Sequence, residues 1–101
     1  MILHCVFCHP LDGAVGELSA VVVELESFSR GLQGVIAFDH GPNRDFEAKS
    51  PDHTIGFVIR FNSAQALVDY AEHPTHQALG GKLCDLCVGG TDGIIVYDLE
   101  F

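Results

Sequence analysis

The chain has 101 residues and a formal net charge of −9, with 14 acidic residues against 5 basic ones. This length suits one domain, and the acidic balance argues against binding to nucleic acid or anionic membrane surfaces, since both require clustered Lys and Arg. Hydrophobic residues make up 48% of the chain, but no apolar run approaches the length of a membrane span. The composition therefore predicts a single domain, residues 1–101, that binds neither nucleic acid nor a membrane.

The first half of the chain predicts a strand, a helix, a strand and a loop. Residues 2–8 (ILHCVFC) are apolar with β-branched and aromatic members, which is typical of a buried strand. Residues 14–30 place apolar side chains at helical spacing, with glutamates between them. Residues 34–40 (GVIAFDH) predict a second strand, and the polar, proline-containing residues 41–52 predict a loop.

The second half begins with another strand and continues with an interrupted helix. Residues 53–61 (HTIGFVIRF) predict a third strand. A helix capped by Asn62-Ser63 follows and ends at residue 70 or 71. His73-Pro74 interrupts it, because the residue before a proline avoids helical geometry while proline itself starts helices well. The second helical segment then spans residues 74–87.

A glycine pair lies inside that second helical segment, at residues 80–81. Glycine is unfavourable in a helix, so the pair indicates either close packing or room left for a ligand. Residues 89–93 (GGTDG) predict a turn, and residues 94–101 (IIVYDLEF) predict the last strand.

The order of elements is strand, helix, strand, strand, broken helix, strand, which predicts a ferredoxin-like β-α-β-β-α-β sandwich of the α+β class. Both helices would cover one face of the sheet. The other face is apolar as well. Side chains alternate along a strand, so Leu3, Cys5 and Phe7 lie on one side of the first strand and His4, Val6 and Cys8 on the other. An uncovered apolar face predicts a partner, and a homodimer is the simplest one.

Four cysteines occur as two separated pairs, in CVFCH and in CDLC. The first matches the attachment pattern of a c-type haem, but the sequence begins without a secretory leader, so we expect a cytoplasmic protein with free thiols. Cys5 and Cys8 would point to opposite faces of their strand, which argues against a shared metal ion. We therefore expect no metal and no cofactor, with the cysteines acting as small buried apolar residues.

Four segments, HCVF, GVIAFDHGPN, DYAEHPTHQAL and IIVYDLEF, resemble the stress-responsive dimeric α/β-barrel (Dabb) family. The most specific pieces are YAEHPTH and the GVxxFxxGxN pattern formed by Gly34, Val35, Phe38, Gly41 and Asn43. The resemblance implies a homodimeric α+β barrel with a pocket between the sheet and the helices of each subunit. A polyketide-cyclase branch of the family closes rings by aldol chemistry without a cofactor, using the Tyr and the second His of the motif.

Carried over to this chain, the resemblance makes Tyr70 and His76 the catalytic candidates and places His4 near the pocket. A neutral imidazole can accept a proton near neutral pH, and a phenol can donate a hydrogen bond to a developing oxyanion. Within one continuous helix the two side chains would lie well apart, so the His73-Pro74 break is needed to bring them together. The predicted substrate-binding residues are His4, Val6, Phe57, Ile59 and His73.

Each candidate also has a purely structural interpretation. Tyr70 can anchor the first half-helix, and His73 can be a cap before the proline. His76 can lie at the surface or form a hydrogen bond to a carbonyl, and His4 can be a satisfied core histidine. The chain also departs from the family at His9-Pro10 and at His53, near the strand ends.

Three classes of function therefore fit. The first is an apolar small-molecule binder for a carbonyl-bearing ligand, with or without aldol or cyclase chemistry. The second is a non-catalytic dimeric stress-response or interaction module. The third is a cofactor-free or haem-dependent enzyme resembling a monooxygenase.

Overall fold

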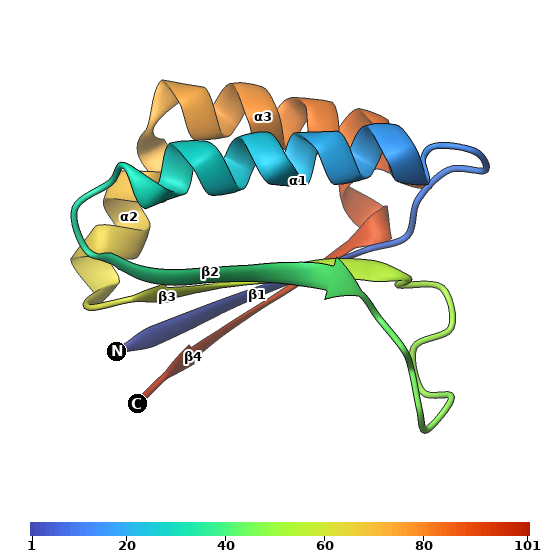
Figure 1. The fold of residues 1–101 in the computed structure, drawn as a ribbon, viewed down its shortest axis with the longest axis horizontal. Coiled ribbons are helices and arrows are strands. Elements are labelled where there is room, and N and C mark those ends of the chain that lie inside the picture. Colours follow the sequence, from blue (N-terminus) through green and yellow to red (C-terminus); the bar gives the residue numbers. More distant parts are fainter.

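The computed structural model describes residues 1–101 as one antiparallel sheet with helices on a single side (Figure 1). In chain order the elements are β1 (Ile2–Cys8), α1 (Val15–Arg30), β2 (Val35–Pro42), β3 (Ile55–Phe61), α2 (Ala64–Glu72), α3 (Pro74–Asp85), the 3-10 helix η1 (Gly90–Gly93) and β4 (Ile94–Glu100). This order confirms the predicted ferredoxin-like α+β fold.

The sheet has the strand order β2-β3-β1-β4, so the two strands nearest the chain ends lie side by side. Figure 1 shows α1 and α3 next to each other in a layer over the sheet, with α2 rising to that layer at one end. The termini meet beside β1 and β4, where the Met1 amino group donates to the Phe101 carbonyl oxygen at 2.9 Å and the Phe101 N–H donates to the Met1 carbonyl oxygen at 3.0 Å.

Strand alternation divides the sheet into a helix-covered face and an uncovered one, which we call the outer face. Phe57, Ile59 and Phe61 on β3 point toward the helices and are almost fully buried. The outer face carries the side chains of alternate residues directly opposite one another across the strands: Leu3, Cys5 and Phe7, Val58 and Arg60, and Ile95, Tyr97 and Leu99. The predicted alternation of β1 is thus confirmed.

The break between α2 and α3 forms as the His-Pro dipeptide predicts. Ser63 caps α2 by accepting a hydrogen bond from the Ala66 N–H at 3.2 Å. His73 ends α2 in an extended conformation (φ −66°, ψ 132°), and Pro74 begins α3 in its first turn. A new helix can therefore start in a new direction one residue after the first one ends.

Two predicted boundaries were wrong near the loop between β2 and β3. The strand β2 continues through Gly41 and Pro42, which the sequence assigned to the loop, because both residues pair with β3 opposite Gly56 and Ile55. Pro42 is tolerated there since β2 is an edge strand, where a missing N–H costs no ladder bond. The following strand β3 begins at Ile55, two residues later than residue 53.

Candidate functional site

A cavity of about 310 Å³ lies between the helix-covered face of the sheet and α3. This volume falls at the lower end of the range for small-molecule sites. Five of the residues predicted to form the site contribute to its wall: His4, Val6, Phe57, Tyr70 and His76.

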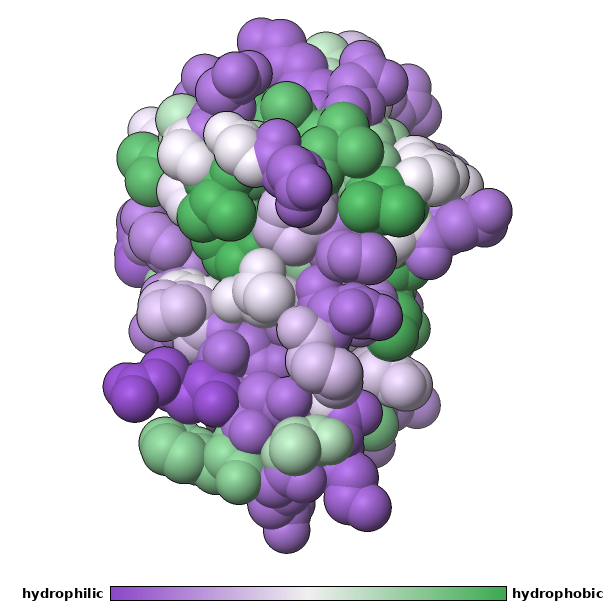
Figure 2. Space-filling model, turned by 90° about the vertical axis from the view of Figure 1, so that its right-hand side faces the viewer, coloured by the Kyte–Doolittle hydropathy of each residue, from purple (hydrophilic) through white to green (hydrophobic).

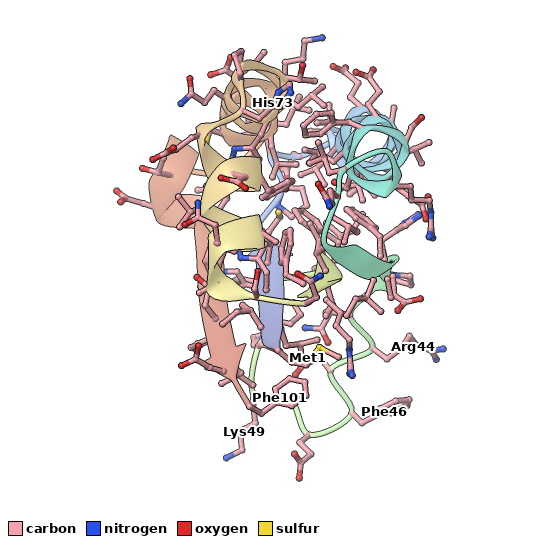
Figure 3. All side chains as sticks on the ribbon, turned by 90° about the vertical axis from the view of Figure 1, so that its left-hand side faces the viewer. Met1, Arg44, Phe46, Lys49, His73 and Phe101 are labelled. Atoms are coloured by element: carbon pink, nitrogen blue, oxygen red, sulfur yellow. The ribbon has the colours of Figure 1, made fainter.

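Two predicted binding residues lie outside this wall. Ile59 is completely buried in the core beneath the helices. The His73 ring caps α3, where its Nδ1 accepts a hydrogen bond from the Thr75 N–H at 3.1 Å, and it packs on Phe28 with 4.7 Å between ring centroids. Figure 3 shows His73 at the helix layer, far from the outer face.

The helix break brings Tyr70 and His76 into contact. Their ring centroids are 4.3 Å apart, with 49° between the ring planes. In an unbroken helix six residues turn through about 600°, which would place these side chains on different sides of the axis. The geometry thus confirms that the interruption at His73-Pro74 unites the two rings.

His76 is held with its Nε2 unprotonated in the neutral state. Its Nδ1 donates to the Ala71 carbonyl oxygen at 3.0 Å, and an acceptor at that position requires the ring proton to be on Nδ1. Burial lowers the pKa of His76 below its ordinary value, and the nearby His4 and His73 lower it further, while the bond to Ala71 opposes them. At neutral pH His76 is therefore a neutral imidazole with a free lone pair on Nε2.

The Tyr70 hydroxyl is less available than its ring. The residue is 1% exposed, and its hydroxyl, like that of Ser29 on α1, is fully buried without a hydrogen-bond partner. Burial raises the pKa of Tyr70, and the proximity of Ser29 offsets this only in part. The ring forms part of the cavity wall, whereas the hydroxyl is buried in the protein beside α1.

Asp98 is a functional candidate that the sequence analysis missed. The His4 Nδ1 lies 2.5 Å from the Asp98 Oδ1, because the two residues are direct cross-strand partners on β1 and β4. A carboxylate acceptor keeps the ring proton on Nδ1, so neutral His4 also has a free Nε2. The alternation of side chains along β4 could have indicated Asp98, because Asp98 lies on the same face of the strand as the apolar Ile94 and Val96.

The glycine pair of α3 leaves open space beside the helix and does not serve to bring another element into close contact with it. A Cβ atom added at Gly80 or at Gly81 would meet no atom within 4 Å. Gly80 lies in the cavity wall one helical turn from both His76 and Cys84, while Gly81 faces solvent. Of the two explanations for the pair, room beside a ligand is the one that the geometry supports at Gly80.

The cysteines are all free thiols, and three of them are buried. Cys5 lies on the outer face and Cys8 on the helix-covered face, where it contacts Cys87. Burial, reinforced by the Cys87 thiol, raises the pKa of Cys8 to about 12, and burial also raises that of Cys87. No group of three or more His, Cys, Asp and Glu side chains is arranged to hold a metal ion.

A second, larger hollow of about 660 Å³ lies on the outer face, under the loop between β2 and β3. We call it the outer groove. Its floor includes Phe7, Gly56 and Val58, and its rim is formed by loop residues 43–50. Figure 2 views the end of the molecule from which this loop projects: apolar side chains gather over the helix ends above, and the loop below is mostly hydrophilic.

The stress responsive A/B barrel domain family (Dabb) matches residues 2–101. The chain belongs to this family. Comparison with curated proteins finds no match for this Dabb domain, and none of its helices is both long and apolar enough to cross a membrane.

Solved structures resemble this Dabb domain over its whole length. A dimeric ferredoxin-like protein of unknown function from Jannaschia sp. CCS1 is 42% identical, with a TM-score of 0.94 over 99% of this chain and 98% of that one. A protein from Arabidopsis thaliana is 19% identical, with a TM-score of 0.84 over 100% and 95% of the two chains. The second resemblance supports the fold alone.

Proposed function

We propose that this Dabb domain binds an apolar, carbonyl-bearing small molecule in the cavity beside α3, and that His76 acts there as a base. The observation that carries the proposal is the neutral His76 in the wall of an apolar cavity, its proton committed to Ala71. Apolar walls with a few polar groups are the usual composition of a small-molecule site. An anionic ligand is disfavoured because the wall contains no Lys or Arg.

The proposed chemistry is removal of a proton from a carbon next to the ligand's carbonyl. The Nε2 of His76 takes the proton, and the electron pair of the broken C–H bond passes into the carbonyl to form an enolate. That enolate can attack a second carbonyl of the same ligand, which is the aldol step of a ring closure. This reaction needs no cofactor. Protonated His76 then returns its proton to the new alkoxide.

Other cavity residues have supporting roles in this proposal. Tyr70 holds His76 by ring contact, and its hydroxyl would need to turn away from Ser29 before it could donate to the enolate oxygen. His4, held by Asp98, provides a second ring nitrogen in the wall. The His4 and Tyr70 rings meet edge to face with their centroids 5.8 Å apart, so His4 also fixes the position of Tyr70.

We further propose that the domain works as a homodimer in the cytoplasm. The outer face leaves Tyr97 and Leu99 more than half exposed, at 57% and 56%. A protein 42% identical over nearly the whole chain is described as dimeric. The four free thiols accord with a reducing compartment.

The test uses 2-acetylnaphthalene, an apolar fluorescent ketone whose methyl protons lie next to its carbonyl. Fluorescence titration measures binding, and proton NMR in D₂O measures exchange of the methyl protons. We expect saturable binding and an exchange rate above that of buffer. The variant His76→Ala should retain most of the binding and lose the exchange, because a base contributes mainly in the transition state. His53→Ala, which removes an imidazole outside the cavity, is the matched control.

The alternatives give different results in the same experiment. Binding of the ketone without exchange of its methyl protons would indicate a small-molecule carrier and would refute catalysis by His76. Absence of both would favour the non-catalytic dimeric module. A shifted Soret band after addition of haemin would instead favour the haem-dependent enzyme.

A further inference from the structure

Three of the four cysteines gather where α3 ends and the chain returns to the sheet. Cys84 lies in the last turn of α3, Cys87 follows in the turn after that helix, and Cys8 is the last residue of β1. Burial raises the pKa of Cys8 and of Cys87, and the nearby Cys84 raises both further. Cys5 lies apart from them on the outer face, so the other three form a separate group, which we call the thiol cluster.

The turn after α3 holds Cys84 and Cys87 at a distance that suits a disulfide. The Cys87 N–H donates to the Cys84 carbonyl oxygen at 3.0 Å, which closes a turn of four residues. The Cα atoms at the two ends of such a turn lie less than about 7 Å apart, and a disulfide needs about 4.4–6.8 Å. A bond between the two sulfur atoms therefore requires rotation of the side chains and no large movement of the backbone.

The position of Cys87 is fixed by the sheet. The neighbouring Val88 N–H donates to the His9 carbonyl oxygen at 2.9 Å, which ties the turn to the end of β1. A Cβ added at Gly93 would lie 3.1 Å from the Cβ of Cys87, so no room remains on that side. Because Cys87 is held beside Cys84 before any reaction, little entropy is lost when the two sulfur atoms join.

The three thiols differ in their access to an oxidant. Cys8 and Cys87 are almost fully buried, whereas Cys84 is only partly buried and contributes to the cavity wall. The thiolate is the form that attacks an oxidant. Burial, reinforced by Cys87, raises the pKa of Cys8 from 9.0 to about 12, which lowers its thiolate fraction at neutral pH about 1,000-fold. A small oxidant that enters the cavity therefore meets Cys84 first.

We propose that Cys84 and Cys87 form a peroxide-sensitive dithiol at the edge of the cavity. The Cys84 thiolate attacks one oxygen of a hydroperoxide and the O–O bond breaks, which gives a sulfenic acid on Cys84 and releases an alcohol, or water if the oxidant is hydrogen peroxide. The Cys87 sulfur then attacks the Cys84 sulfur, and the sulfenic hydroxyl leaves as water with the proton of the Cys87 thiol. Two thiols are thereby oxidised to one disulfide while one peroxide is reduced.

Formation of this disulfide changes the cavity wall. Cys87 does not line the cavity, so the Cys84 sulfur has to turn toward the residues that follow α3 to reach it. Reduction by a small thiol restores the starting state through thiol–disulfide exchange. The oxidation state of the pair thus controls the part of the wall that lies one helical turn from Gly80. This reaction goes beyond the function proposed above, since it involves neither the ketone nor His76.

The experiment treats the reduced full chain with a small excess of hydrogen peroxide, alkylates the remaining thiols and identifies the oxidised residues by peptide mass spectrometry. We expect a single disulfide between Cys84 and Cys87 that dithiothreitol reverses. Cys84→Ser should slow the loss of thiols at least about tenfold, because it removes the accessible thiolate. Cys87→Ser should stop at the sulfenic acid on Cys84, which dimedone traps. The matched control is Cys5→Ser, which removes a cysteine outside the thiol cluster and should form the disulfide at the wild-type rate.

The wild type alone decides the result if circular dichroism shows that a variant has not folded. A disulfide that joins another pair of cysteines, a sulfinic acid on Cys84 beside an unreacted Cys87, or four intact thiols after the treatment would each overturn the proposal. Equal rates of thiol loss in the wild type and in a folded Cys84→Ser would overturn it as well. None of these results bears on the ligand proposed for the cavity, which the ketone titration tests separately.

Discussion

Substitutions at Gly80 test two things separately: ligand binding in the cavity and the stability of α3, which forms part of the cavity wall. Gly80 and Gly81 are neighbours on α3, and a Cβ at either position meets open space. Replacing either with alanine should stabilise the protein by about 1 kcal/mol, because glycine is that much less favourable than alanine inside a helix. For a domain of 101 residues, this corresponds to a rise in Tm of about 4–8 °C.

Larger side chains should distinguish the two positions. Gly80 lines the 310 Å³ cavity and Gly81 does not. We expect Gly80→Leu to displace about two or three carbon groups of a bound ligand, each contributing about 0.8 kcal/mol. The affinity for 2-acetylnaphthalene should therefore fall about 15- to 50-fold. Gly81→Leu should bind this ketone like the wild type.

The assay is fluorescence titration of each variant, with thermal unfolding followed by circular dichroism on the same samples. Equal losses of affinity in Gly80→Leu and Gly81→Leu would refute the assignment of the cavity as the binding site. A drop in Tm for Gly80→Ala would show that the space at this position is needed by the fold, and would refute the role assigned to this glycine.

Three further predictions follow from particular contacts. Ser63→Ala should lower the stability by about 1 kcal/mol, since it removes the cap of α2; thermal unfolding measures this, and an unchanged Tm would contradict it, with the exposed Ser27→Ala as control. In the native protein, a thiol reagent should react rapidly with Cys84 and slowly with the buried Cys8 and Cys87; mass spectrometry identifies the modified residue, and fast labelling of Cys8 would count against the packing described. The folded protein holds the pKa of His76 below its ordinary value. Protonation of His76 therefore favours unfolding, and the stability of the protein should fall as the pH drops below about 6.5. Denaturant titrations at several pH values should show a weaker pH dependence for His76→Gln, and an equal dependence in both proteins would exclude His76 as its source.

Local sequence signals predicted the elements because their causes are local. The alternation in residues 2–8 and the His73-Pro74 dipeptide act within a few residues. The Tyr70–His76 contact followed from the same break. The extension of β2 through Pro42 was missed because its cause lies in the pairing with β3, which the residues of β2 do not reveal.

The parts of the site that could not be predicted depend on register and on side-chain direction. Asp98 faces His4 only because β4 pairs with β1 in one particular register. The direction of the Tyr70 hydroxyl, toward Ser29 on α1, depends on how α1 packs on α2, and no spacing along the chain encodes it. Ile59 shares a strand face with Phe57, but its position under the helices keeps it out of the cavity.

The neighbouring positions of β1 and β4 in the sheet also have a consequence for folding. Strand β1 comes first in the order of elements, yet its partners are the residues around Phe61 on one side and around Glu100 on the other. Pairings between such distant residues slow folding. The contact between His4 and Asp98 likewise joins residues that are 94 positions apart in the sequence. The cavity therefore gains the part of its wall formed by Ile94 and Val96 only when this long-range pairing of β4 with β1 has formed.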